Sequence, residues 1–298
     1  MNQRTLKNSY IFEGKGLHQG QFARMTLVPA APDSGIRFFR TDLGIEIPAL
    51  AEYVSSTVRC TTIANGAASV STIEHLMSAM TGLGVDNVRV EIDNLEVPIL
   101  DGSARPYVEA ILADGLQEQD APRRYVELRE EVEVRNENGS FVRISPAEEF
   151  SYELTSDFGS RVLGVQTAAW NADTDYVSEL ASCRTFCFFH ELEYLAGHGL
   201  IKGGDVDNAI VVVEHPVSEE QIARLAHIFG IRDIRVTDQG YLNNLALHFP
   251  NECGRHKLLD LIGDLRLCGG FLRARVTAYK AGHAINTSAA KALRESKQ

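Results

Sequence analysis

A unit made of a helix, a glycine and an alternating strand occurs twice in this 298-residue chain, and it constrains the fold more than any other feature. Residues 72–84 have the apolar spacing of a helix that stops at Gly84, and residues 87–92 alternate apolar and polar side chains like a half-buried strand. Residues 256–270 and 271–279 repeat this order. The repeat predicts two related halves that arose by internal duplication, with chance recurrence of a common unit as the alternative.

A polar segment, residues 116–124, lies between the two units and contains Pro122. Its composition is typical of a linker, so we predict a domain boundary near residue 122, with one domain at 1–122 and another at 123–298. Further helices are predicted at 104–115 and 218–230, and further strands at 142–146, 150–158, 208–214 and 233–237. Strands and helices mixed in this order favour two α+β domains over one doubly wound sheet.

The charge balance and the cysteines narrow the class of protein. With 29 basic and 40 acidic side chains, the formal net charge is −11, which argues against nucleic acid as a partner and against a polybasic membrane anchor. The N-terminus lacks the apolar core of a signal peptide, and no stretch approaches the ~20 apolar residues that span a bilayer. Five cysteines without a CxxC pair predict a cytoplasmic protein with reduced, mostly buried thiols.

His256 and Asp260 form the first pair that can carry chemistry. They are four residues apart on a predicted helix, so both side chains lie on one face. An imidazole and a carboxylate in that arrangement can bind one zinc ion, although such a pair is more often a surface hydrogen bond. Asp264 follows on nearly the same stripe and can accept a hydrogen bond from an imidazole.

Glu74 and His75 begin the first repeated helix, with Ser71 or Thr72 as its expected N-cap. Neighbouring helical residues point about 100° apart, so they cannot both face one metal. They can have separate roles, in which His75 binds the metal and Glu74 takes a proton from a metal-bound water. Because His75 and the second helix's Asp260 lie at matching distances before their glycine stops, we predict a metal between the two units.

Two further segments leave alternatives open. His283 follows Gly282 at the end of the second alternating strand, where it is either a catalytic group or an exposed turn residue. The stretch from Phe186 to Ile201 is rich in apolar side chains and forms either ordinary core or an apolar binding passage. Residues 197–204 lack the GxxxxGK[ST] pattern, which excludes a nucleoside-triphosphate hydrolase of the P-loop class.

Taken together, these motifs resemble the zinc-dependent UDP-3-O-acyl-N-acetylglucosamine deacetylases of lipid A biosynthesis. The resemblance is ordered and covers nearly the whole chain. It rests on GKGLHQG (14–20), STIEHL (71–76), VPILDGSARP (97–106), SCRTF (182–186), IKGGDVDNAIV (201–211), HKLLDLIGDL (256–265) and AGHAINT (281–287). The family's fold implies two similar α+β domains packed face to face, with the active site between them.

The resemblance also implies roles for individual residues. It makes His75, His256 and Asp260 the ligands of Zn²⁺, with water in the open position. Glu74 matches the family's general base, and either Glu74 or His283 protonates the leaving amine. Other positions follow the same comparison. Asp264 matches the acid that holds His283, Thr185 supports the oxyanion, Lys257 contacts the substrate, and Phe186, Leu192, Ile201 and Val211 belong to an acyl-chain-binding insert near 186–211. His18 and Asp101 match family motifs without an assigned role.

The implied reaction is hydrolysis of the 2-acetamido group of UDP-3-O-acyl-N-acetylglucosamine to a free amine and acetate, the committed step of lipid A biosynthesis. It implies a cytoplasmic monomer without a transmembrane segment that comes close to a membrane transiently, and longer versions carry a fused dehydratase domain. Two alternatives remain: a zinc amidohydrolase with another acylated substrate, and a non-enzymatic domain stabilised by zinc. A closed site with four protein ligands would favour the latter.

Overall fold

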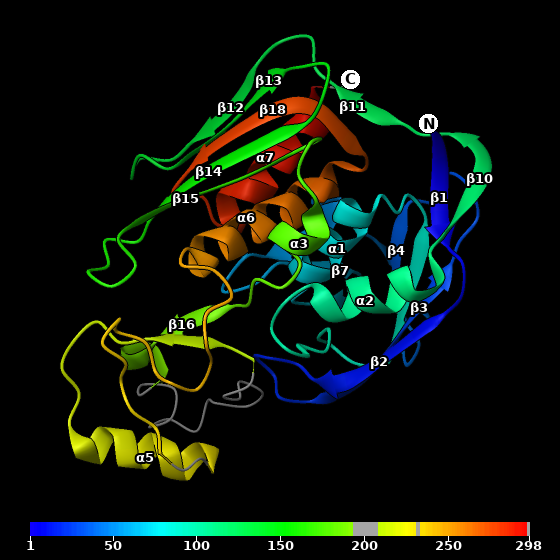
Figure 1. Cartoon of the computed structure of the whole chain (residues 1–298). Helices are drawn as coiled ribbons and strands as arrows, with labels where there is room; N and C mark the ends of the chain where they lie inside the picture. Colours follow the sequence, from blue (N-terminus) through cyan, green and yellow to red (C-terminus); the bar gives the residue numbers. More distant parts are fainter. Residues whose placement is uncertain (193–207, 231–232, 297–298) are drawn as a thin grey trace.

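The structure is a computed structural model that describes residues 1–192, 208–230 and 233–296 (Figure 1). Strands and helices are mixed along the chain, which confirms the predicted α+β class. All five cysteines are free thiols, and four of them are buried. Among the described residues, no helix is both long enough and apolar enough to cross a bilayer.

The first large sheet is built from the early part of the chain. Its strands lie in the order β2 (Tyr10–Lys15), β3 (Phe22–Pro29), β9 (Val88–Ile92), β4 (Ile36–Arg40) and β5 (Ile45–Pro48). Only β4 and β9 run parallel within this sheet; its other neighbours are antiparallel. On β9, Val88, Val90 and Ile92 are buried while Arg89 and Glu91 are partly exposed, as the alternation predicts.

The second large sheet has the same topology. Its strands are β12 (Val132–Arg135), β13 (Phe141–Pro146), β18 (Phe271–Tyr279), β14 (Ser151–Asp157) and β15 (Val165–Asn171), with β11 (Tyr125–Glu127) paired to β18 at one side. In both sheets, the strand that comes last in the sequence lies between the strands that come second and third in the sequence. It runs parallel to the third of these strands. This shared topology agrees with the repeated sequence unit, and the duplication itself stays an interpretation.

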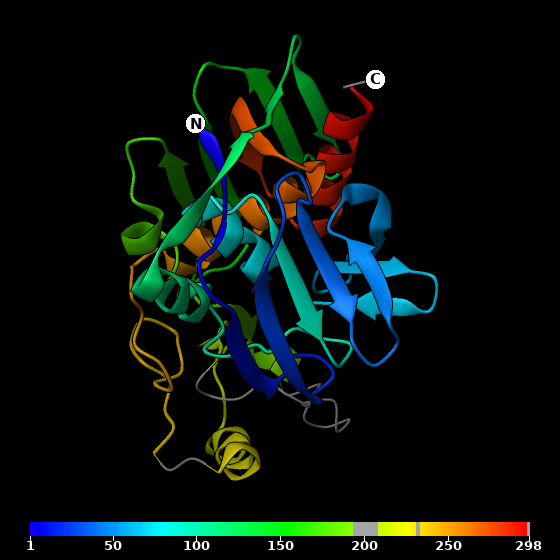
Figure 2. The ribbon, with the colours of Figure 1, turned by 90° about the vertical axis from the view of Figure 1, so that its right-hand side faces the viewer.

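Two helices lie between the sheets and pack against each other (Figures 1 and 2). Helix α1 (Glu74–Leu83) leads into β9, and α6 (Glu252–Leu265) leads into β18 through the short 3₁₀ turn η2 (Arg266–Cys268). Gly84 and Gly269 end these units in the left-handed conformation, as predicted. At Gly263 the helices meet so closely that an added Cβ would lie 2.0 Å from the Glu74 carbonyl oxygen.

The remaining elements surround this centre. They are β1 (Asn2–Leu6), η1 (Ala51–Tyr53), β6 (Val54–Ser56), β7 (Thr62–Asn65), β8 (Ala68–Val70), α2 (Arg105–Asp114), β10 (Leu116–Pro122), α3 (Tyr176–Glu179), β16 (Phe186–Phe188), β17 (Ile210–Val212), α5 (Glu219–Phe229) and α7 (His283–Glu295). The parallel pair β16–β17 and helix α5 lie away from the two large sheets (Figures 1 and 2). Predicted helices at 104–115 and 218–230 are confirmed as α2 and α5.

Three local predictions are wrong. The polar segment 116–124 is not a linker, because most of it is strand β10, which pairs antiparallel with β1 and so satisfies its backbone groups at an edge. Neither Ser71 nor Thr72 caps α1; the N-cap is Ile73, and the Thr72 hydroxyl donates to Glu96 instead. Residues 233–237 form only an isolated bridge between Val236 and Leu242 rather than a strand. The domain boundary near residue 122 stays a prediction.

Candidate metal centre

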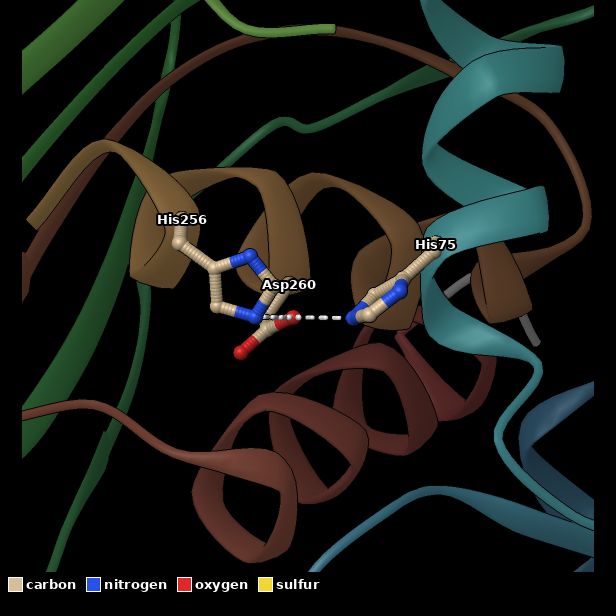
Figure 3. A group of neighbouring side chains, drawn as sticks. All are labelled: His75, His256 and Asp260. Carbon is tan, nitrogen blue, oxygen red and sulfur yellow. Dashed lines mark ion pairs between the residues drawn. The ribbon is translucent and has the colours of Figure 1, made fainter. Parts of the chain in front are cut away.

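Three potential metal ligands converge where α1 meets α6. His75 is the second residue of α1, while His256 and Asp260 lie one turn apart on α6. All three are buried, and their nearest ligand atoms lie within 4.8 Å of one another. Figure 3 shows both imidazoles directed at the carboxylate; His75 Nε2 and His256 Nε2 lie 3.6 and 3.4 Å from Asp260 Oδ1. The structure therefore brings together the three residues predicted as ligands.

The hydrogen bonds around these groups leave the metal-facing atoms available. His256 Nδ1 donates to the Cys183 carbonyl oxygen at 3.1 Å, which leaves Nε2 as the ligand atom. Lys257 Nζ donates to Asp260 Oδ2 at 2.7 Å. Asp260 Oδ1 is buried and has no hydrogen-bond partner among the described residues. An unpaired buried carboxylate oxygen facing two imidazoles fits a cation, and two nitrogens with one oxygen fit Zn²⁺ with an open fourth position.

The protonation states also fit metal binding, which requires neutral imidazoles and an ionised carboxylate. Burial lowers the pKa of His75 to about 3, and it lowers the pKa of His256 as well. Burial alone would raise the pKa of Asp260, but the neighbouring His256 imidazole and Lys257 ammonium hold that pKa below its ordinary value.

A second cluster lies beside the ligands and joins α1, α6 and α7. His283, the first residue of α7, donates from Nδ1 to Asp264 Oδ2 at 2.9 Å. Its Nε2 lies 3.9 Å from Oε1 of Glu74. The other oxygen of Glu74 accepts the backbone N–H of Thr61 at 3.0 Å. The predicted acid–base residues therefore form a connected chain from Asp264 through His283 to Glu74.

Two residues that the sequence did not single out complete this cluster. The Thr61 hydroxyl donates to Asp264 Oδ1 at 2.6 Å, and the Asn286 amide donates to Asp264 Oδ2 at 2.9 Å. Thr61 is 203 residues from Asp264, so no local spacing could have indicated the pair. Asn286 lies within the 281–287 motif, so the motif could have identified it as a residue of the site.

The environment raises the pKa of both acid–base groups, Glu74 and His283. Burial raises the pKa of Glu74 to about 7. Burial alone would lower the pKa of His283, but the carboxylates of Asp264 and Glu74 raise it to about 9. A carboxyl group that titrates near neutrality and an imidazole that remains protonated there suit a general base beside a proton donor.

These groups open onto one cavity of about 290 Å³. Thr185, Phe186 and Lys257 line it together with Glu74, the metal ligands and His283, as the predicted roles require. Other lining residues had no individual role in the predicted site, although Phe188 belongs to the apolar stretch predicted as a possible binding passage. They are Leu17, Arg59, Thr72, Phe158, Cys187, Phe188 and Glu191. His18, which had no assigned role, also lines the cavity, whereas Asp101 binds Ser103 and Arg105 in a nearby turn.

Arg59 is an exposed cation at this cavity with a left-handed backbone, at φ 68°. Its guanidinium forms no ion pair within the described ranges. It therefore leaves a positive charge available to an anionic ligand.

The predicted acyl-chain residues are only partly brought together. Phe186 lines the cavity, while Leu192 and Val211 are buried in a hydrophobic cluster with Phe189 and with Leu225 of α5. That cluster packs around β17 and α5, and Cys187 lies between it and the cavity. Ile201 lies outside the described residues. The acyl-binding roles of Leu192, Ile201 and Val211 stay predictions.

The loop that carries Thr185 is fixed to the start of α6 by a buried ion pair. Arg184 Nε lies 2.9 Å from Glu252 Oε1, and its Nη2 donates to the Ala246 carbonyl at 2.6 Å. Glu252 also accepts the backbone N–H groups of Arg184 and His248. Because Cys183 and Thr185 flank Arg184, this pair holds in place both the carbonyl that orients His256 and the hydroxyl at the cavity.

Known proteins resemble this chain over nearly its whole length. The profile of the family described as UDP-3-O-acyl N-acetylglycosamine deacetylase matches residues 3–228 and 232–295. The "Bifunctional enzyme LpxC/FabZ" of Porphyromonas gingivalis is 42% identical over 296 residues, which cover 98% of this chain and 64% of that protein.

Two relatives carry the name "UDP-3-O-acyl-N-acetylglucosamine deacetylase". That of Anaeromyxobacter sp. (strain Fw109-5) is 41% identical over 286 residues, which cover 96% of this chain and 86% of the relative. That of Pseudomonas entomophila is 41% identical over 293 residues, with 96% and 88% covered. The chain spans only 64–65% of the bifunctional relatives that it matches.

Proposed function

Because the chain belongs to the UDP-3-O-acyl N-acetylglycosamine deacetylase family, we propose that it hydrolyses the 2-acetamido group of UDP-3-O-acyl-N-acetylglucosamine with the help of a bound Zn²⁺. The observation that carries this proposal is one cavity in which three buried ligand side chains lie beside the Asp264–His283–Glu74 chain. The names of the Anaeromyxobacter and Pseudomonas relatives support the choice of substrate.

His75, His256 and Asp260 would hold the metal. When bound, Zn²⁺ supplies a Lewis acid that lowers the pKa of water to about 7 and polarises a carbonyl group. The unpaired Asp260 Oδ1 supports this assignment, because a buried acceptor without a donor is costly unless a cation neutralises it.

The chain's own residues move the protons. Glu74 takes a proton from water as the water oxygen bonds to the amide carbon, and Thr185 with protonated His283 stabilises the negative oxygen. The C–N bond then breaks as the nitrogen receives a proton, which leaves acetate and a free amine. Asp264 keeps His283 charged and oriented, and Thr61 and Asn286 in turn hold Asp264.

The cavity offers matching groups for the rest of the substrate. Arg59 and Lys257 provide positive charge for the diphosphate despite the chain's net charge of −11. Phe158, Phe186 and Phe188 provide an apolar wall next to them for the acyl chain. We assign the reaction to lipid A biosynthesis; the cytoplasmic location, the monomeric state and the transient contact with a membrane stay predictions.

The proposal is tested by zinc content and turnover measured together on the whole chain. Glu74→Gln is expected to lower turnover by about 100- to 10,000-fold with zinc content near one ion per chain, since the variant removes the base and keeps the ligands. His75→Ala is expected to lose zinc, and Glu109→Gln on the exposed face of α2 serves as the control. Full turnover in metal-free protein, or zinc loss in Glu74→Gln, would contradict the assignment.

A panel of other N-acetylated sugars and peptides separates this reaction from that of a related amidohydrolase. Turnover of another substrate in preference to the UDP-sugar would favour that alternative. Zinc binding without hydrolysis of any substrate would favour a domain that zinc only stabilises.

A further inference from the structure

A second cavity of about 270 Å³ lies beside the second sheet, at the opposite ends of α1 and α6 from the metal ligands. It shares no lining residue with the cavity of the metal centre. From His75 to Thr81 the α1 axis advances six residues, or about 9 Å at ~1.5 Å per residue. The two cavities are therefore distinct sites connected by the same pair of helices.

The wall of this cavity is largely aromatic. Tyr152 and Trp170 stack with their ring centres 5.6 Å apart, and Phe150 lies 4.5 Å from Trp170. Phe271 and Leu272 of β18 add to the apolar surface. Such a wall favours a flat or apolar ligand body.

Arg266 brings a positive charge into this apolar setting. It is 7% exposed, and its guanidinium carbon lies 3.9 Å from the Phe271 ring centre. One nitrogen, Nη2, donates to the Val85 carbonyl at 3.1 Å. The other, Nη1, is buried with no hydrogen-bond partner among the described residues. Burial lowers the pKa of Arg266 to about 10, so the group stays charged at neutral pH.

Within the described residues, no carboxylate forms an ion pair with Arg266. The nearby Asp86 is already engaged by Arg123, whose Nη2 lies 2.7 Å from Asp86 Oδ2. Arg4 also lines the cavity, and its side chain makes no ion pair within the described ranges. The chain has a net charge of −11, yet two guanidinium groups at this apolar cavity lack a carboxylate partner. Because a buried charge is costly without a counter-charge, this arrangement favours binding of an anion from outside the chain.

We propose that this cavity binds a small apolar carboxylate, with the carboxylate on Arg266 and the hydrocarbon or aryl group against Trp170 and Tyr152. A monoanion matches the one buried guanidinium with a free N–H, and the volume lies near the lower end of the range for ligand pockets. A carboxylate is planar and accepts paired hydrogen bonds from a guanidinium group. The site is independent of the metal and of the proposed reaction.

Trp170 makes the proposal directly measurable, because it is the chain's single tryptophan and lines the cavity. The probe is 4-ethylbenzoate, and 4-ethylbenzamide is its uncharged counterpart of nearly the same shape. We expect 4-ethylbenzoate to change Trp170 emission saturably, with or without a metal chelator, and 4-ethylbenzamide to bind at least ~10-fold more weakly, since a charge-assisted hydrogen bond is lost.

Variants locate the binding site. Arg266→Met is expected to weaken 4-ethylbenzoate binding at least ~10-fold, while Arg266→Lys retains part of it because the charge remains. Arg135→Met, an exposed arginine of β12, is the matched control and should bind normally. Circular dichroism checks that each variant is folded. The absence of a saturable change in the native protein, equal binding of the amide, or unchanged binding by Arg266→Met would overturn the proposal.

Discussion

The buried ion pair between Arg184 and Glu252 should make a large contribution to stability that depends on both partners. The Glu252 side chain is 0% exposed, and the Arg184 side chain is 7% exposed. Replacing Arg184 with Met leaves an ionised carboxylate buried with two backbone donors, without its guanidinium partner, and with the His248 imidazole 3.6 Å away. Removal of one partner from a buried pair costs about 3–5 kcal/mol, whereas exchange of both partners for apolar residues is often near neutral.

We therefore expect Arg184→Met to lower the free energy of unfolding by about 3–5 kcal/mol, measured by urea denaturation followed through Trp170 emission. The double variant Arg184→Met/Glu252→Met should lose less than the single variant. The control is Arg24→Met, whose pair with Glu13 is exposed on both sides and is expected to cost at most about 1 kcal/mol. A loss below 1 kcal/mol in Arg184→Met, or additive losses in the double variant, would refute the reasoning.

Arg184→Met should also weaken metal binding at the candidate metal centre. The Cys183 carbonyl orients His256, and Cys183 is the neighbour of Arg184. Loss of a partner that orients a metal-bound imidazole typically lowers metal affinity by about 10- to 100-fold. Competition with a chelator measures this directly, and unchanged zinc affinity would show that the loop keeps its position without the ion pair.

Two further predictions concern the contact between α1 and α6 and the effect of pH. Gly263→Ala is expected to cost at least about 1–3 kcal/mol and to weaken zinc binding, because its Cβ would lie 2.0 Å from the Glu74 carbonyl oxygen; Gly14→Ala, which meets only ordinary contacts, is the control. Burial alone would raise the pKa of Glu252, but hydrogen bonds from Arg184 and His248 hold it below its ordinary value. The contribution of ionised Glu252 to stability is therefore present at pH values above its unfolded pKa of about 4.3, and it is lost as the pH falls through the pKa of the folded state. The wild-type protein should therefore lose stability more steeply in acid than Arg184→Met/Glu252→Met, which lacks this carboxylate. Equal slopes in urea denaturation at several pH values would contradict this.

Local patterns were sufficient where the structure depends on short-range spacing. The alternation in β9 and β18 and the glycine stops at Gly84 and Gly269 were readable because each is set within a few residues. The polar composition of residues 116–124 led to the wrong prediction of a linker. An edge strand such as β10, which pairs with β1, tolerates the same polar residues as a linker does. Thr72 was misread as a cap because its hydroxyl bonds the distant Glu96.

Residue spacing along the sequence predicted part of the metal centre. The spacing of His256 and Asp260 placed both on one face of α6, and the repeat placed His75 at the matching distance before its own glycine. Spacing could not indicate Thr61, whose hydroxyl meets Asp264 only after the two halves come together. Spacing also could not distinguish Phe186, which lines the cavity, from Leu192 and Val211, which pack in the hydrophobic cluster around β17 and α5.

The repeated topology explains why the site requires both halves. Corresponding positions before the glycine stops hold His75 in α1 and Asp260 in α6, so equivalent places contribute different ligand types to one centre. The second half adds His256 one turn earlier, while the first adds Glu74 beside its own ligand. Gly263 lets the two helices approach closely enough for these groups to meet. The two halves thus share one topology and differ in the side chains at these positions, and that difference places an acid–base pair beside the three potential ligands.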